Sequence, residues 1–223
     1  MKELTLIIPA KNEAESLPIV LSELDKYNFK IDIILHPSDI QTIQAIQKYN
    51  INIVYQKNMG YGDALILGIK NCKTKYFCIF NADGSFNPSE IHKMYNILNT
   101  KQLDFIFASR YQKNSGSDDD TIITLVGNFL FTFIGKIFFH LNISDILYTF
   151  VMGKTEKANK LNLVQKDFSF CVELPIKANK MKMKLGSINS YERKRIAGNK
   201  KVNALRDGIL ILKQMIKLFF TKL

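Results

Sequence analysis

The stretch "YFCIFNADGSFNPSEI", residues 76–91, joins an apolar run to an acidic turn and the start of a helix. Residues 76–80 form a short apolar run of the kind found in buried strands. Asn87 and Pro88 then supply a cap and a proline for the first turn of a helix. The stretch therefore predicts a strand that passes into a helix through a turn carrying Asp83.

The same alternation of short apolar runs and helical patterns extends through the first half of the chain. Strands are predicted at 4–8, 31–35, 51–55, 76–80 and 103–108, and helices at about 16–27, 39–48, 62–71 and from 88 onward. Strands that alternate with helices favour an α/β fold with a mostly parallel central sheet and helices on both faces.

In such a sheet, ligands bind at the carboxyl ends of the strands. The residues expected there are 9–13, 36–39, 81–85 and 109–110. Asp83 therefore lies in a suitable place for a binding site. In "GYGDAL", Gly60 and Gly62 would let the backbone approach an anion at the N-terminus of the next helix. A tight loop explains this pair equally well.

The composition narrows the class of protein. A chain of 223 residues, 47% hydrophobic and 23% charged, buries one substantial core. The formal charge of +11 favours an anionic partner, such as nucleic acid, an anionic membrane or a phosphorylated substrate. Three cysteines without metal-ligand spacing indicate buried thiols in a reducing compartment. With no secretory signal pattern at the start, we expect a cytoplasmic protein.

The second half of the chain has a less regular pattern. Residues 111–120 are polar and rich in turn formers, so they predict a mobile loop. Residues 122–141 are strongly apolar and about long enough to cross a bilayer. Because Lys136 and His140 would make a crossing costly, a core helix or a membrane-surface helix is favoured.

The C-terminal segment, residues 204–223, has the pattern of a basic amphipathic helix. Arg206, Lys213 and Lys217 share one helical face, and the apolar residues are mostly opposite. Such a helix can lie in the surface of an anionic membrane. It can equally dock on the core of its own domain.

Several motifs together resemble the signatures of family 2 glycosyltransferases. In chain order they are "LTLIIPAKNEAESLP", "NMGYGDALILGIKNCKTKYFCIFNADGSFNP", "FIFASRY", "ISDILYTFVMGKTE", "FSFCVELPIKA" and "ERKRIAGNKKVN". They look most like the dolichyl-phosphate mannose synthase and polyprenyl-phosphate sugar transferase branch, and the resemblance extends to about residue 203.

The resemblance implies a GT-A fold and an inverting, metal-dependent glycosyltransferase. Such an enzyme uses Mg²⁺ or Mn²⁺ to move a sugar from a GDP- or UDP-sugar to a polyprenyl- or dolichyl-phosphate lipid. It would be peripherally associated with the cytoplasmic face of a membrane. The transferase domain would span residues 1–203, with a nucleotide-sugar half at about 1–112 and an acceptor half at about 113–203, before the helix at 204–223.

The motifs and the resemblance assign roles to particular residues. The nucleotide-binding residues are Pro9, Ala10, Asn12, Glu13, Asp39, Gly60, Asn81 and Ala82. The metal ligands are Asp83, Asn81 and Ser85, and the catalytic residues are Asp83, Arg110, Arg195 and Lys201. The acceptor-side residues are Asp145, Glu173, Gly198 and Lys200, of which the two acids could also be buried structural groups. A single carboxylate suffices in principle, because Mg²⁺ keeps waters and takes the other oxygens from the substrate's phosphates.

The chain departs from the family pattern at several positions. Asn81 stands where the family has the first acid of Asp-Ala-Asp, so we expect a lower metal affinity. The family's paired acids after the second strand are replaced by "HPSD", residues 36–39, which leaves the nucleotide base open. Lys200 replaces a family serine, and a basic residue usual after the loop is missing between Lys113 and Lys136.

Because of these departures, three alternative functions are considered. A hydroxyl acceptor would need a carboxylate base, for which Asp118, Asp119 and Asp120 are candidates, whereas a lipid phosphate is already ionised. A non-catalytic relative would bind a nucleotide, a membrane or a partner. Binding of nucleic acid is not favoured, because base-stacking aromatics and recognised motifs are missing.

Overall fold

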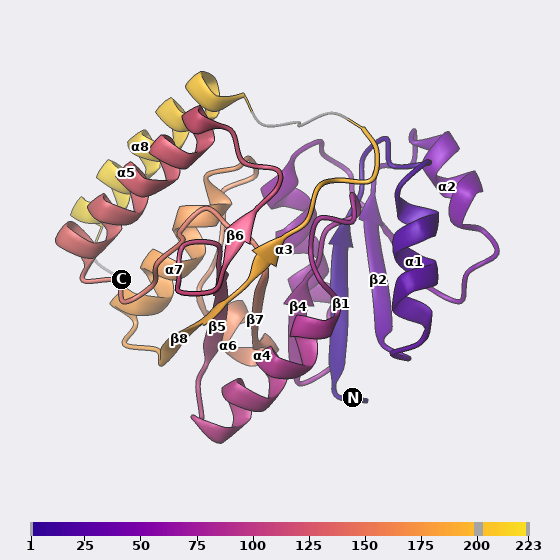
Figure 1. Ribbon diagram of the computed structural model, residues 1–223, viewed down its shortest axis with the longest axis horizontal. Helices are drawn as coiled ribbons and strands as arrows, with labels where there is room; N and C mark the ends of the chain where they lie inside the picture. Colours follow the sequence, from indigo (N-terminus) through magenta and orange to yellow (C-terminus); the bar gives the residue numbers. More distant parts are fainter. Residues whose placement is uncertain (1, 199–202, 222–223) are drawn as a thin grey trace.

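A seven-stranded sheet crosses the middle of the molecule, with helices packed against both of its faces (Figure 1). The structure is a computed structural model that describes residues 2–198 and 203–221. The strand order is β3-β2-β1-β4-β7-β5-β8, and β7 alone runs antiparallel to its neighbours. The predicted α/β class with a mostly parallel central sheet is confirmed.

The described residues form the following elements. The strands are β1 Leu4–Pro9, β2 Lys30–Leu35, β3 Asn52–Tyr55, β4 Tyr76–Ile79, β5 Phe105–Ser109, β6 Gly116–Ser117, β7 Val151–Lys154, β8 Leu185–Asn189 and β9 Tyr191–Glu192. The helices are α1 Leu17–Asp25, α2 Ile40–Ile46, α3 Tyr61–Asn71, α4 Ser89–Thr100, α5 Ile122–Phe139, α6 Thr155–Lys160, α7 Phe170–Lys180 and α8 Ala204–Phe220.

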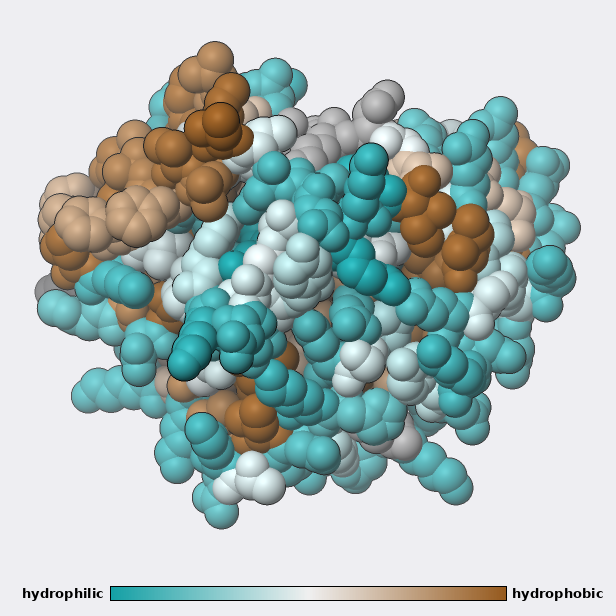
Figure 2. Space-filling view, viewed as in Figure 1, coloured by the Kyte–Doolittle hydropathy of each residue, from teal (hydrophilic) through white to brown (hydrophobic). Residues whose placement is uncertain are grey.

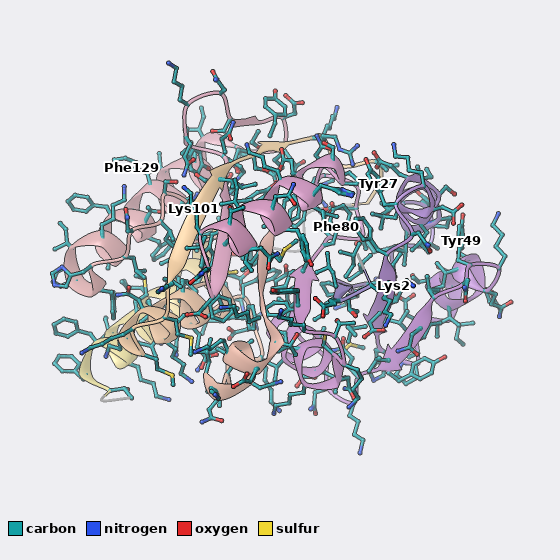
Figure 3. All side chains as sticks on the ribbon, turned by 90° about the horizontal axis from the view of Figure 1, so that it is seen from below. Lys2, Tyr27, Tyr49, Phe80, Lys101 and Phe129 are labelled. Carbon is teal, nitrogen blue, oxygen red and sulfur yellow. The ribbon has the colours of Figure 1, made fainter. Side chains whose placement is uncertain are left out.

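The helices divide between the two faces of the sheet. The apolar residues of α1, α2 and α4 pack on one face, and those of α3, α5, α6, α7 and α8 pack on the other. Along β1, Leu6 and Ile8 face the first core and Ile7 faces the second, as the two-residue repeat of a strand requires. Phe80, labelled in Figure 3, is fully buried just after β4. The sheet is therefore covered on both sides, which explains the continuous apolar strands.

The strand order reverses direction at β1 and β4. The chain passes from β1 outward through β2 to β3, and then returns to place β4 on the other side of β1. Both pairings with β1 are parallel, so these strands end at the same edge of the sheet. A reversal of this kind leaves a crevice outside the strand ends.

The second half contains elements that the sequence did not predict. The antiparallel strand β7 inserts between β4 and β5, and α6, α7 and β8 follow it. Val151–Lys154 is too short to show a periodic pattern of its own, and its place depends on pairing with strands far away in the sequence. The predicted loop at 111–120 contains β6, which pairs with β9.

Candidate functional site

A cavity of about 540 Å³ lies at the edge of the sheet where β1, β2 and β4 end. This volume is within the range of small-molecule sites. Of the residues assigned from the sequence, it is lined by Pro9, Ala10, Asn12, Glu13, Asp39, Gly60, Asn81, Ala82, Asp83, Ser85, Arg110 and Arg195. Because β7 is antiparallel, the segment before it also reaches this edge and contributes Tyr148 and Thr149.

The wall beside β1 and β2 is fixed by the carboxylate of Asp39. This residue caps α2 by accepting a hydrogen bond from the Thr42 amide at 3.4 Å, and it accepts another from the Asn12 amide at 2.7 Å. The Asn12 backbone is in the left-handed region, with φ 54°. The turn after β1 is thereby held over the end of β2.

Close packing, rather than a ligand, accounts for the glycines at the start of α3. A Cβ atom on Gly60 would lie 2.2 Å from the Lys166 carbonyl oxygen, and one on Gly62 would lie 2.1 Å from the Gln165 oxygen. The loop at 165–167 therefore approaches α3 more closely than any other residue type allows. Gly60 also lines the cavity, but its conformation is explained by this contact.

The turn after β4 presents the Asp83 carboxylate to the cavity. One carboxylate oxygen accepts a hydrogen bond from the Ser85 amide at 3.0 Å, and the other faces Arg195. Asn81 accepts a hydrogen bond from the Phe86 amide at 3.3 Å, and its side-chain amide donates to the Ser85 hydroxyl. Asn81 and Ser85 thus form a small oxygen-rich group beside Asp83.

A basic segment lies along this turn. The Arg193 amide donates to the Ser85 carbonyl and the Ile196 amide donates to the Asp83 carbonyl, both at 2.8 Å. The Arg193 guanidinium makes two 2.9 Å hydrogen bonds to Glu23 on α1. These contacts place the segment that follows β9 directly against the acidic turn.

Arg195 lies between two carboxylates. Its guanidinium is 3.4 Å from the nearer Asp83 oxygen and 3.1 Å from an Asp119 oxygen. Burial lowers the pKa of Arg195, but the hydrogen bond to Asp119 and the charge of Asp83 outweigh it, so the pKa lies above its usual value. Gly198 is exposed and does not line the cavity, and Lys200 and Lys201 lie outside the described residues.

Arg110 forms the second charged centre. Its guanidinium contacts Asp145 at 2.8 Å and both Asp120 and Glu192 at 3.1 Å, and it lies 4.6 Å from the centre of the Tyr148 ring. Burial lowers the pKa of Arg110, but the charges of Asp145 and Glu192 raise it well above its usual value. Arg110 is thus permanently charged and rigidly held in the cavity wall.

The two acids expected on the acceptor side, Asp145 and Glu173, are buried and bind other residues of the domain. Asp145 is buried behind Arg110 and also accepts a hydrogen bond from the Asn128 side chain at 2.6 Å. Glu173 is buried too, pairs with Lys177 at 2.7 Å and accepts hydrogen bonds from the Val164 and Gln165 amides. Neither side chain lines the cavity, so each can act on a ligand only by positioning other groups.

Glu192 is a cavity residue that the sequence did not reveal. It accepts hydrogen bonds from Arg110 at 3.1 Å and from the Ser117 hydroxyl at 2.5 Å, and burial raises its pKa. The three acids predicted as candidate bases do not line the cavity. Asp118 binds the Tyr191 hydroxyl, Asp119 binds Arg195, and Asp120 binds Arg110. Glu192 opens the motif "ERKRIAGNKKVN", but the motif gave it no role, and only the fold shows that it pairs with Arg110.

The charges at the site leave a deficit of positive charge. Among the residues that line the cavity, six carboxylates face four cationic side chains, which are Lys11, Arg110, Arg195 and Arg206. A diphosphate entering the cavity would add negative charge and would be repelled. A divalent cation would offset this excess of negative charge.

The residues at the acidic turn fit a loosely held divalent cation. Within residues 2–198 and 203–221, no three His, Cys, Asp or Glu side chains are arranged to hold a metal ion. Asp83 offers a partly exposed carboxylate, and Asn81 and Ser85 offer neutral oxygens beside it. This donor set suits Mg²⁺ or Mn²⁺ if water and a bound phosphate supply the remaining ligands.

Replacing Asn81 with aspartate should strengthen this cation site. The carboxylate keeps the bond from the Phe86 amide and adds a charge next to Asp83, so Mn²⁺ should bind about tenfold more tightly. The loss of the free Mn²⁺ signal in electron paramagnetic resonance measures this binding. Asn87→Asp, in the same turn but outside the cavity lining, is the matched control. Equal Mn²⁺ binding by the wild type and Asn81→Asp would contradict the assignment.

Comparison with known sequences identifies a family. A family model described as "Glycosyl transferase family 2" matches residues 5–161. An uncharacterized protein of Methanocaldococcus jannaschii is 27% identical over 137 residues, which cover 59% of this chain and 56% of that protein. An uncharacterized glycosyltransferase of Rickettsia prowazekii is 35% identical over 101 residues, covering 43% of this chain and 31% of the other. The chain therefore spans about half or less of the length of these relatives.

Comparison with solved structures agrees with the fold. Glucosyl-3-phosphoglycerate synthase from Mycobacterium tuberculosis, crystallised with Mn²⁺, UDP and glucosyl-3-phosphoglycerate, superposes with a TM-score of 0.75 at 11% identity, covering 99% of this chain and 80% of that one. Its complex with Mg²⁺ and UDP superposes with a TM-score of 0.70 at 11% identity, covering 99% and 79%. The likeness extends over the second half of the chain, including the elements that the sequence did not predict.

Proposed function

The chain belongs to glycosyl transferase family 2, and we propose that it transfers a sugar, with inversion, from a nucleotide-diphosphate sugar to a polyprenyl- or dolichyl-phosphate lipid. One observation supports this most strongly. Asp83 and Arg195 meet in the cavity at the point where the strand order reverses, with Arg110 in the same cavity wall. That is where a nucleotide diphosphate binds in folds of this kind.

The donor would lie across the ends of β1, β2 and β4. In this proposal Pro9, Ala10, Asn12, Glu13 and Asp39 border the base and ribose, and Gly60, Asn81 and Ala82 border the path to the diphosphate. The glucosyl-3-phosphoglycerate synthase structures, which hold UDP with Mn²⁺ or Mg²⁺, support a nucleotide and a divalent cation as ligands. His36 and Ser38 line the cavity where the family pattern has paired acids. The donor in this proposal is therefore either a GDP-sugar or a UDP-sugar.

The charge on the departing diphosphate would be balanced from two sides. Asp83 would hold Mg²⁺ or Mn²⁺, with Asn81 and Ser85 as neutral neighbours, and the bound ion would stabilise the leaving group. Arg195 would pair with the phosphate oxygens once the donor displaces it from Asp83. Lys200 and Lys201 follow Arg195 in sequence and would add cations to the same segment.

The acceptor step needs no proton transfer if the acceptor is a phosphate. An ionised phosphate oxygen attacks the anomeric carbon, and the bond from that carbon to the diphosphate breaks. The sequence lacked a basic residue between 113 and 136 for this acceptor. Arg206 on α8 lines the cavity and would supply that charge. Asp145 and Glu173 would act on the acceptor side only by positioning Arg110 and the 164–165 backbone.

A hydroxyl acceptor is the second candidate, and Glu192 is the observation that favours it. Glu192 lines the cavity, and its raised pKa suits a group that takes a proton from a hydroxyl. Its two hydrogen bonds to Arg110 and Ser117 hold it in place but reduce its basicity. The two candidates differ in the product, which is a lipid-linked phosphodiester in one case and a glycoside in the other.

The proposal assigns the two substrates to different halves of the chain and places the protein at a membrane. Residues 1–112 would bind the donor, residues 113–203 would bind the acceptor, and the protein would work at the cytoplasmic face of a membrane.

Thermal unfolding with a panel of nucleotide sugars, each with and without Mn²⁺ or Mg²⁺, tests the donor site. A ligand at a hundred times its dissociation constant should stabilise the protein by about 2.7 kcal/mol. One donor should raise the melting temperature only when the metal is present. If no nucleotide sugar shifts the melting temperature, the protein is a non-catalytic relative that binds a membrane or a partner.

A further inference from the structure

The outer face of α5 is apolar and exposed along its whole length. Ile122 is 80% exposed and Phe129 is 74% exposed, although both are large hydrophobic residues. This face consists of Ile122, Val126, Phe129, Leu130, Phe133 and Ile137. Among the described residues, α5 is the one helix long and apolar enough to cross a membrane, but its opposite face packs on the domain through buried Asn128 and Phe131.

A second exposed apolar face lies next to it on α8. It consists of Leu205, Ile209, Leu212, Ile216, Phe219 and Phe220. The Phe219 ring contacts the rings of Phe138 and Phe139 on α5 at centroid distances of 5.8 and 6.1 Å. The two helices lie side by side, and the apolar residues gather over them at the upper left of Figure 2 (Figures 1 and 2). We call the outer faces of both helices the α5–α8 apolar surface.

The domain holds α8 firmly in this position. Ile211, Met215 and Leu218 on its inner side belong to the buried core. At its C-terminal end, Lys180 of α7 donates hydrogen bonds to the carbonyl oxygens of Leu218 and Thr221. The exposed residues are therefore presented outward by a fixed helix, and Phe129 lies on the outer side of the molecule in Figure 3. Soluble monomers rarely expose large contiguous apolar patches.

Basic side chains border the α5–α8 apolar surface. Lys213 and Lys217 are exposed on α8 beside Ile216, and Lys136 is exposed on α5 beside Phe133. An amphipathic helix with lysines at the edge of its apolar face suits an anionic bilayer, whose phosphates pair with the lysines. A two-fold contact between copies would instead place like charges around one rim.

The α5–α8 apolar surface begins at the cavity. The residue two positions before α5, Asp120, is bound to Arg110 in the cavity wall. At the other helix, Asn203 caps α8 and lines the cavity together with Arg206. Both helices thus start next to the cavity, where Arg206 is exposed, and run in the same direction (Figure 1).

We propose that the α5–α8 apolar surface lies in the interface of an anionic membrane and holds the cavity mouth at the lipid headgroups. This proposal deepens the proposed function, since it names the surface through which the acceptor would arrive. A lipid phosphate could then enter from the bilayer with its chain among the apolar side chains and its phosphate near Arg206. The lysines would lie at headgroup level.

Flotation with vesicles of phosphatidylglycerol and phosphatidylcholine tests this surface. Phe133→Glu and Ile216→Glu each place a charge on one of the two helices, at positions 52% and 53% exposed, where folding should be unaffected. Ile19→Glu, on α1 and also 52% exposed, is the matched control. The wild type and Ile19→Glu should float with the vesicles. Phe133→Glu and Ile216→Glu should each partition about tenfold more weakly.

The outcomes separate this proposal from the proposed function. The proposal that the α5–α8 apolar surface binds a membrane is wrong if the wild type stays in solution. It is also wrong if Phe133→Glu and Ile216→Glu float as well as Ile19→Glu does. A wild type that elutes as a dimer, and that these two substitutions convert to a monomer, would assign the surface to a second copy instead. Donor binding measured without vesicles should be the same in all variants, because none of the three residues lines the cavity.

Discussion

Replacing Asp83 with alanine is expected to abolish measurable sugar transfer. In the proposed site this carboxylate is the charged ligand of the metal, and it faces Arg195 across 3.4 Å. Without this carboxylate, no bound cation would stabilise the negative charge of the departing diphosphate. Turnover should therefore fall by about a hundredfold to a thousandfold. The change should be in kcat at saturating metal, and donor binding should no longer depend on Mn²⁺.

Asp32→Ala is the control for Asp83→Ala. Asp32 also accepts a hydrogen bond, from the Asn52 side chain, but it lies on β2 away from the cavity lining. Both variants should melt close to the wild type, because Asp32→Ala loses one exposed hydrogen bond and Asp83→Ala loses one hydrogen bond and one partly exposed ion pair, while Arg195 keeps its pair with Asp119. If Asp83→Ala turned over as fast as Asp32→Ala, the assignment of the metal site would be wrong.

Replacing Arg110 with methionine is expected to cause the largest loss of stability. The substitution leaves Asp145, Asp120 and Glu192 without the cation that they share, and Asp145 is fully buried. Removing one member of a buried charge network costs about 3 to 5 kcal/mol. Urea unfolding measures the effect. Arg193→Met, which breaks a more exposed pair with Glu23 and a hydrogen bond to the Phe86 carbonyl, is the control and should cost less, about 2 kcal/mol.

The stability deficit of Arg110→Met should depend on pH. Burial already raises the pKa of Glu192, and the charge of Arg110 counteracts this rise. Removing that charge should therefore raise the pKa of Glu192 further. The folded variant then holds a proton that the unfolded chain releases, so it gains stability as the pH falls below the raised pKa. The deficit should be largest near neutral pH and smaller in acid. A deficit that does not change with pH would show that unpaired carboxylates are not its cause.

The first half of the fold could be predicted from the sequence because its information is local. Apolar runs, caps and prolines mark β1 to β4 and the helices between them, each within a few residues. The second half depends on contacts between distant segments. For β7 the partners are residues 76–78 and 105–107, and no local pattern in Val151–Lys154 indicates an antiparallel strand between them.

The candidate site divides in the same way. Asp83, Arg110 and Arg195 stand in recognisable motifs, and the structure brings Asp83 and Arg195 together. Glu192 opens the motif "ERKRIAGNKKVN" and Arg206 belongs to the basic face predicted for the last helix, but neither pattern gave the residue a role in the cavity. Both reach it because β9 and α8 return to the cavity. The glycines of "GYGDAL" indicated close approach, but whether the approaching atoms belonged to a ligand or to residues 165–167 depended on the fold.

Transfer of labelled sugar into an organic-extractable lipid tests the central claim most directly. The protein is incubated with polyprenyl phosphate and each labelled GDP- or UDP-sugar, with and without Mn²⁺ or Mg²⁺, and Asp83→Ala is run beside it. The account predicts that one donor labels the lipid fraction, only with metal and only in the wild type. A donor that binds with metal but labels only a hydroxyl acceptor, or labels nothing, would contradict it.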